Sequence, residues 1–304
     1  MKPALVQFPH ISSYPVLLLL GFFFGWLLAR SRAKRFSLAG SHLDNIALLL
    51  SVAGLFGARL FARLFYEKAP FLEALQVWKG DGLVFYGGFI FGMLAVFAYG
   101  FIRRVPLIRL ADCLAPSVAL GLAFGRVGCF LAGCCWGDVC VEPSRLSAID
   151  DPAAVARIQT LPALSPPGSP FAVTFPARSD VTEQHIKLGL ISTGSQRSLP
   201  VHPVQLYEAV LAAILSALLH FASRGPSAPG LASIALLLGY AFIRFCTEFF
   251  RADNKLYAGD FTFSQTVSLW MAAACLLLLA ARKLIRRAPA PAAAVPYKPH
   301  PASG

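Results

Sequence analysis

Two arginines stand inside apolar runs that are long enough to cross a membrane. Arg126 lies within LAPSVALGLAFGRVGCFLAGCCWG (114–137), and Arg244 lies within LASIALLLGYAFIRFCTEFF (231–250). A guanidinium group is costly to insert into hydrocarbon, so each arginine is a candidate functional residue. The planar fork of arginine also matches two oxygens of a phosphate group. Together the two arginines predict a membrane protein that holds an anionic headgroup.

The two arginines differ in the acidic partners that the sequence offers them. Arg244 and Glu248 are four residues apart, so on a helix they share a face and can form an ion pair. Arg126 has no acidic residue within one helical turn, and its partner must come from another helix or from a ligand. The candidate partners are Glu208, Asp112 and Glu248.

Four polar aromatic residues lie near the expected helix ends, namely Tyr14, Tyr86, His202 and Tyr207. Tyrosine is common at both membrane surfaces, where it merely anchors a helix. His202 titrates near neutral pH, so it can serve as a general base. It can equally cap or orient the helix that follows, and both interpretations stay open.

Four cysteines, Cys129, Cys134, Cys135 and Cys140, form the pattern C-x4-C-C-x4-C after Arg126. The pattern does not match the paired C-x2-C knuckles of structural zinc sites, so we expect no metal site and no cofactor. A disulfide in an oxidising compartment, a reactive thiolate beside the arginine and simple close packing remain as alternatives.

Composition indicates the class of protein that must position these residues. The chain is 57% hydrophobic and 14% charged, far from the roughly one quarter of charged residues in soluble domains. A membrane-spanning helix needs about 20 mostly apolar residues. We therefore predict an all-α integral membrane protein with seven transmembrane helices. The expected helices begin near Tyr14, Leu43, Leu83, Asp112, Gln205, Leu231 and Phe261.

The net charge of +12 is distributed along the chain in a way that indicates membrane topology, not a nucleic-acid partner. Basic clusters follow the first and last expected helices, at 30–35 and 282–287, and another separates the third and fourth at 103–109. In a seven-helix chain all of these lie on one side. The positive-inside rule makes that side cytoplasmic, with the N-terminus outside and the C-terminus inside.

Residues 138–203 interrupt the helical pattern with a polar segment rich in proline and serine, which we expect to form a small external head. Within it, FAVTF (171–175) alternates like a short strand. We assign 1–287 to one transmembrane domain that includes this head, and 288–304 to a disordered cytoplasmic tail. Gly87 and Gly88 open the third helix, where they suit a backbone that bends or approaches a ligand.

Several motifs, in one order along almost the whole chain, resemble the prolipoprotein diacylglyceryl transferases. They include Tyr14, Arg59, the stretch WKGDGLVFYGG (78–88), ADCLAP (111–116) and GRVGCFLAGCCWG (125–137). PFAVTFP, HPVQLYE and GYAFIRFCTEFFR complete the series. The resemblance implies a bacterial inner-membrane protein with seven helices and a periplasmic head. Its partners would be phosphatidylglycerol, other membrane lipid and the signal peptides of prolipoproteins.

The resemblance implies transfer of the diacylglyceryl group of phosphatidylglycerol to the thiol of a lipobox cysteine, with release of glycerol 1-phosphate. Both intramembrane arginines would bind the phosphate and stabilise the charge that develops on it. The catalytic residues implied are Arg126, Arg244, Tyr86 and Tyr14, and the residues implied to contact the phospholipid are Arg126, Gly87, Gly88, Cys129, Gly137 and Glu248.

This sequence departs from the family pattern at three positions near the chemistry. Tyr86 replaces the histidine of the family's HGG motif, Cys129 replaces an asparagine, and Cys134 replaces an acidic residue. The phosphate-binding half of the pattern is intact, whereas the half that handles the thiol is altered. Two alternatives therefore accompany the transferase: a paralogue that transfers the lipid group to another acceptor, and a lipid-binding protein without turnover.

Overall fold

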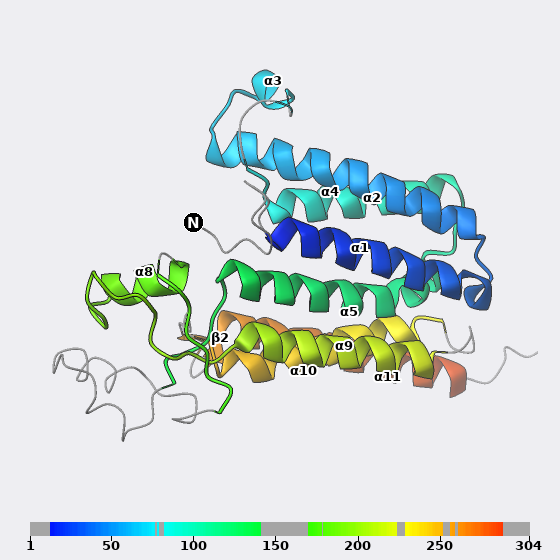
Figure 1. The fold of residues 1–304 in the computed structure, drawn as a ribbon. Helices are drawn as coiled ribbons and strands as arrows, with labels where there is room; N and C mark the ends of the chain where they lie inside the picture. The colour runs from blue at the N-terminus through cyan, green and yellow to red at the C-terminus, as the bar shows by residue number, and fades with distance from the viewer. Residues whose placement is uncertain are drawn as a thin grey trace, which may run out of the picture.

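The computed structural model describes residues 13–76, 78, 82–140, 170–177, 179–223, 229–251, 256–258 and 261–287, and they are mostly helical (Figure 1). The α-helices are α1 (Ser13–Arg32), α2 (Gly40–Phe61), α3 (Phe71–Ala74), α4 (Phe85–Ile102), α5 (Leu107–Ala132), α8 (Asp180–Lys187), α9 (Val204–Ala222), α10 (Leu231–Glu248) and α11 (Phe263–Arg287). The shorter elements are a 3₁₀ turn η1 (Ala33–Phe36), a π-helical turn η2 (Ala62–Tyr66), and strands β1 (Leu256–Ala258) and β2 (Phe261–Thr262).

Six of the described helices are long and apolar enough to cross a membrane: α1, α2, α5, α9, α10 and α11. The remaining expected span, α4, is a shorter apolar helix. The last helix begins at Phe263, two residues later than expected, because Phe261–Thr262 pair with β1 in a small antiparallel hairpin. The fold is thus that of a multi-pass membrane protein, as composition predicts.

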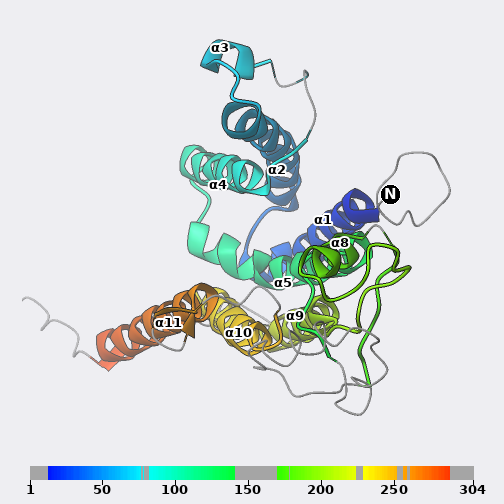
Figure 2. The same cartoon turned by 90° about the vertical axis from the view of Figure 1, so that its left-hand side faces the viewer.

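Helix α5 lies at the centre of the molecule and packs against α1, α9 and α10. The view along the helices in Figure 2 shows the α2–α4 pair on one side of α5, and α9, α10 and α11 on the other. Arg126 therefore stands on a central helix that packs against three others. The expected site is built around a central element.

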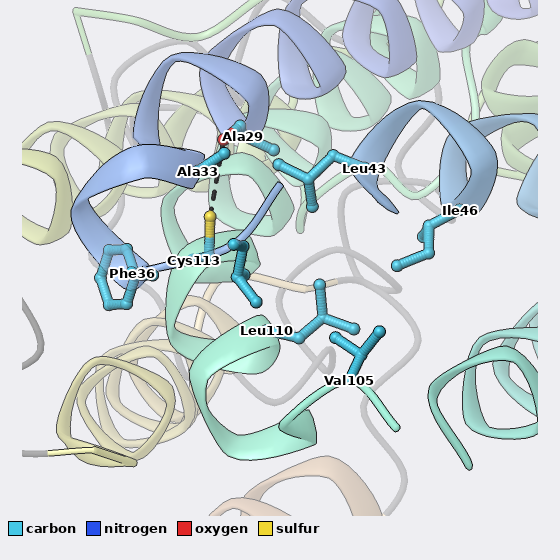
Figure 3. Close-up of a cluster of buried hydrophobic side chains, with 9 residues drawn as sticks. Ala29, Ala33, Phe36, Leu43, Ile46, Val105, Leu110 and Cys113 are labelled. Atoms are coloured by element: carbon cyan, nitrogen blue, oxygen red, sulfur yellow. Dashed lines mark hydrogen bonds between the residues drawn. The ribbon is translucent and has the colours of Figure 1, made fainter. Parts of the chain in front are cut away.

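A buried apolar cluster fixes the start of α5 against the first two helices (Figure 3). Phe36 comes from η1, Leu43 and Ile46 from α2, and Leu110 and Cys113 from α5. The thiol of Cys113 also donates a hydrogen bond, 3.5 Å long, to the carbonyl oxygen of Ala29 on α1. Burial of such side chains contributes about 1.5–3 kcal/mol each when apolar, and it sets the position of α5 along α1.

Residues 170–203, here called the head segment, form a small unit at one end of the helices around α8 (Figure 1). Ser179 caps α8, because its hydroxyl accepts a hydrogen bond from the amide of Thr182 at 3.3 Å. Buried Phe175, Val181 and Val201 form its core, and Phe130 of α5 packs against them. The head segment is thereby attached to the end of α5.

The expected strand at 171–175 is wrong in the structure. Only Val173 pairs, through an isolated bridge with Val201. Pro176 forms a second isolated bridge, with Arg197, but its nitrogen carries no hydrogen to donate, so the contacts stay single bridges and no strand forms. The predicted tail, 288–304, and the first part of the predicted head, 141–169, lie outside the described residues.

Candidate active site

Arg126 finds its partner on a neighbouring helix. Its Nε forms a close ion pair with Oε2 of Glu208 on α9, which packs directly against α5. The Glu208 side chain is only 5% exposed, whereas that of Arg126 is 21% exposed. Of the three predicted candidates, Glu208 is therefore the partner. The arginine remains open to one side.

Arg244 on α10 uses both of its terminal nitrogens. Nη1 lies 3.0 Å from Oε1 of Glu208, and Nη2 lies 2.7 Å from Oε2 of Glu248. Nη2 also donates to the hydroxyl of Ser264 on α11 at 2.9 Å. The predicted pair between Arg244 and Glu248 is confirmed. Hydrogen bonds from Thr247 to Glu208 and from Thr262 to Glu248, each 2.9 Å, hold the two carboxylates.

These contacts join into one row of alternating charges across α5, α9 and α10. It runs Arg126, Glu208, Arg244, Glu248 and Arg251, whose Nε lies 3.8 Å from Glu248. Three guanidinium groups and two carboxylates thus alternate along the row. In a site of low dielectric constant a guanidinium group that is open on one side attracts an anion strongly.

The free donors of the row belong to Arg126. Among the described residues, the ion pair to Glu208 occupies only its Nε, and its two terminal nitrogens have no hydrogen-bond partner. Those nitrogens are the ones that a guanidinium group offers to two oxygens of a phosphate. The geometry leaves Arg126 as the residue that meets a ligand, with Arg244 held behind it.

Three thiols lie together beside the row. The sulfur atoms of Cys129, Cys134 and Cys135 are all within 4.8 Å of one another, and all three residues are partly buried. Cys129 lies in the last turn of α5, and Gly133 terminates the helix in the left-handed conformation with φ of 69°. Cys135 also has a positive φ, 60°, which costs a non-glycine residue about 1–2 kcal/mol.

The thiols influence one another. Hydrogen bonds from Cys129 and Cys134 lower the pKa of the Cys135 thiol well below its usual range, and Arg251 and Arg126 act in the same direction. The shared hydrogen bonds raise the pKa of Cys134. All seven cysteines of the chain are free thiols in the structure. The disulfide considered for this segment is therefore not formed here.

Tyr14 joins this group from α1. A Cβ atom added at Gly128 would lie 3.0 Å from Cδ2 of Tyr14, so the ring stands directly against α5 where a glycine leaves room. Tyr14 is close enough to Arg126 and Cys129 to interact with them electrostatically. One of the two predicted tyrosines is thus at the site.

Gly137 holds the cysteine segment in place. Its amide donates to the carbonyl oxygen of His202 at 3.0 Å, and it forms a bridge with Arg251. A Cβ atom at this position would lie 2.6 Å from that carbonyl oxygen and 2.5 Å from Cγ2 of Val204. Only glycine allows these backbones to cross so closely. The segment after α5 is thereby fixed against the ends of α9 and α10.

Tyr86, Gly87 and Gly88 lie elsewhere. They begin α4, which packs on α2 and stands apart from α9 and α10 (Figure 2). Tyr86 is 69% exposed. A Cβ atom at Gly87 would meet the carbonyl oxygen of Gly57, and one at Gly88 would lie 3.0 Å from that of Gly54. The two glycines serve the contact between α2 and α4 in this structure.

The structure also places two other candidates. Asp112 accepts hydrogen bonds from the amide and hydroxyl of Ser233, at 2.8 and 2.7 Å, so it caps the start of α10 and does not pair with Arg126. His202 is buried, and its Nδ1 lies 3.3 Å from the hydroxyl of Tyr207. Arg251 was not singled out from sequence; it follows the end of α10 at Glu248 and forms its bridge with Gly137 beyond the helix.

Comparison with known proteins assigns the chain. The family model described as prolipoprotein diacylglyceryl transferase matches residues 3–281. The chain belongs to the prolipoprotein diacylglyceryl transferase family. The resemblance found in the motifs is thus confirmed over nearly the whole length of this family member.

Individual relatives agree with the family match. A protein of Methylococcus capsulatus is 30% identical over 92% of this chain and 95% of its own length. One of Chromobacterium violaceum is 34% identical over 84% of each chain, and one of Clostridium tetani is 26% identical over 89% and 93%. All three are named phosphatidylglycerol–prolipoprotein diacylglyceryl transferase. The row of charges in this family member therefore lies in a transferase fold.

Proposed function

We propose that this protein transfers the diacylglyceryl group of phosphatidylglycerol to the cysteine thiol of prolipoproteins, with release of glycerol 1-phosphate. Membership of the transferase family supports the reaction. The observation that carries the assignment to this site is the row of buried charges that is open at Arg126, whose side chain is 21% exposed. An anionic phosphodiester is the group that such a row binds.

In the proposed reaction the acceptor thiolate attacks the glyceryl carbon that carries the phosphate. The new carbon–sulfur bond forms as the carbon–oxygen bond breaks, and the electron pair leaves with the phosphate oxygen. Negative charge therefore gathers on the phosphate in the transition state. The free nitrogens of Arg126 would donate to it, and Arg244 would contribute its charge through Glu208.

The remaining predicted contacts belong to the same proposal. Tyr14 and Cys129 lie beside Arg126 and would contact the bound phospholipid, as would Gly137 and Glu248 at the same end of the helices. The predicted roles of Tyr86 in catalysis and of Gly87 and Gly88 in phospholipid binding would require the substrate to extend to the start of α4. The signal peptide of the prolipoprotein would enter beneath the head segment.

The proposed location is the bacterial inner membrane. We propose that α4 completes seven spans, that the N-terminus and the head segment are periplasmic, and that the C-terminus is cytoplasmic. The basic residues after α1, between α4 and α5, and at the end of α11 support this orientation. The membrane itself then supplies the phospholipid.

Transfer in a defined system tests the proposal. The purified protein is placed in vesicles of phosphatidylglycerol labelled in its diacylglycerol, with a synthetic lipobox peptide, and labelled peptide and glycerol phosphate are measured together. We expect Arg126→Lys to lower the rate about 10²- to 10³-fold, because lysine keeps the charge but loses the planar fork. Arg109→Lys is the matched control, since Arg109 is an exposed residue of the same helix.

Either of two results would contradict the proposal. Full activity of Arg126→Lys would remove the arginine from the reaction. Bound phosphatidylglycerol without labelled peptide or glycerol phosphate would favour the lipid-binding alternative.

A further inference from the structure

The three-thiol cluster of Cys129, Cys134 and Cys135 is the part of the site that phosphate binding does not use. A tight turn creates it: the amide of Cys134 donates to the carbonyl oxygen of Cys129 at 3.0 Å, and Cys135 follows in the left-handed conformation. This turn brings the sulfur atoms of Cys134 and Cys135 close to the sulfur of Cys129 in the last turn of α5. The backbone strain at Cys135 serves this convergence.

A trio of thiols is unusual for simple packing. Buried cysteines normally behave as single small apolar residues, as Cys275 of α11 does here. Thiols are also weak hydrogen-bond donors and gain little from one another. A soft metal ion, in contrast, is bound well by several thiolates at once. The convergence of three sulfurs therefore indicates a ligand set.

The spacing suits zinc. With zinc–sulfur bonds of about 2.3 Å, the sulfurs of a tetrahedral site lie about 3.8 Å apart. Here all three sulfurs are within 4.8 Å of one another without an ion. Among the described residues, no fourth His, Cys, Asp or Glu belongs to the group. Three protein ligands with one open position are typical of catalytic zinc and not of structural zinc.

The charges around the cluster agree with this ligand set. Three thiolates and one divalent zinc ion carry a net charge of −1. Arg126 and Arg251 are both close enough to Cys135 to interact with it electrostatically. These two guanidinium groups would therefore lie beside the anionic complex and offset part of its charge.

We propose that Cys129, Cys134 and Cys135 bind one zinc ion as thiolates, and that its fourth position accepts the thiol of the acceptor peptide. The second part rests on the proposed transferase function. The acceptor thiol displaces a water molecule from zinc and gives its proton to solvent. Its sulfur then holds the electron pair that forms the bond to the glyceryl carbon. Coordination keeps a thiol deprotonated near neutral pH, where a free thiol is mostly protonated.

Metal content tests the first part. The full-length protein is loaded with zinc, freed of excess metal and measured by elemental analysis. We expect one zinc per chain in the natural protein and in Cys275→Ser, and loss of zinc in Cys129→Ser, Cys134→Ser and Cys135→Ser. The absorption spectrum of the cobalt-loaded natural protein gives a second test that does not depend on the folding of any variant. We expect thiolate charge-transfer bands and the d–d bands of a tetrahedral site. Natural protein that retains no zinc and shows no such bands would overturn the site, as would a disulfide within the trio.

Peptide binding tests the second part. A lipobox peptide added to the cobalt-loaded protein should shift the d–d bands, and the same peptide with serine in place of cysteine should not. Identical spectra with both peptides would overturn the open position. If the spectrum shifts but labelled lipid is never transferred, the transferase proposal fails while the thiol site stands.

Discussion

At the scale of single residues, Glu208 determines whether the site holds together. Its carboxylate contacts both Arg126 and Arg244, and its side chain is 5% exposed. Breaking a buried ion pair from one side leaves charges without compensation, which costs about 3–5 kcal/mol. We expect Glu208→Gln to lower the free energy of unfolding by that amount, measured by thermal unfolding in detergent.

The control for this substitution is Glu183→Gln on α8, because Glu183 is exposed. It should change stability by less than about 0.5 kcal/mol. Equal stability of both variants would show that the row of charges does not support the fold. Addition of an anionic phospholipid should restore part of the stability lost in Glu208→Gln, because its phosphate would compensate the charges of Arg126 and Arg244.

The sequence predicts these residues unevenly. Arg126, Arg244 and the pair with Glu248 follow from hydrophobic context and from spacing on one helix. The choice of Glu208 over Asp112 does not, because it depends on how far α9 is shifted along α5. The three thiols come together because the chain turns at Gly133. The number and spacing of the cysteines in the sequence do not predict the geometry of that turn.

At the scale of elements, the contact between α2 and α4 depends on glycine. A side chain at Gly87 would meet the carbonyl oxygen of Gly57 and the Cβ of Phe61, and backbone of a facing helix cannot move aside cheaply. We expect Gly87→Val to cost about 1–3 kcal/mol through overpacking. Thermal unfolding measures it.

Gly121→Ala on α5 is the matched control, because a Cβ atom there would have nothing within 4 Å. It should be neutral or slightly stabilising. If Gly87→Val unfolded at the same temperature as Gly121→Ala, the two helices would not be in the close contact described.

The head segment carries a pH dependence of its own. Burial lowers the pKa of His185 to about 4, and its neutral Nδ1 accepts a hydrogen bond from the amide of Leu199 at 3.3 Å. In the unfolded chain the pKa is near 6.5, so below that pH the unfolded state binds more protons than the folded state. Stability of the head segment should therefore fall as pH decreases from about 6.5 to 4. His185→Gln should flatten this slope, as followed by hydrogen exchange of residues 180–187, and an unchanged slope would refute the assignment to His185.

Elements were easier to predict than their edges. Apolar length predicts the starts of most of these helices closely, because a span needs a fixed length of apolar residues, but α5 begins at Leu107 and not near Asp112. The alternation at 171–175 leads only to an isolated bridge at Val173, because alternation alone does not show whether a partner segment pairs along the whole length. The short β1–β2 hairpin likewise has too few residues to show a pattern.

At the scale of the whole molecule, the two ends of the helices differ in character. Figure 1 shows the head segment and α3 at one end, and the loops that follow α1 and α4 at the other. That second end gathers basic residues, including Arg103 and Arg104. One of its arginines is structural: Arg32 is fully buried and donates to the hydroxyl of Ser223 at 2.7 Å.

This difference predicts the orientation in the membrane. An enzyme that folds only outside the cytoplasm should be active when inserted after Gly194, in an exposed turn of the head segment, and inactive when fused after Arg287. A fluorescent protein that matures only in the cytoplasm should give the reverse pattern at the same two points. Each point is tested with both reporters, which give opposite signals on the two sides of the membrane. A signal lost through poor expression of one fusion is therefore not mistaken for a location. Activity of the first reporter at Arg287, together with fluorescence of the second at Gly194, would show the opposite orientation. The open side of Arg126 would then face the cytoplasm, where no acceptor that has crossed the membrane could reach it.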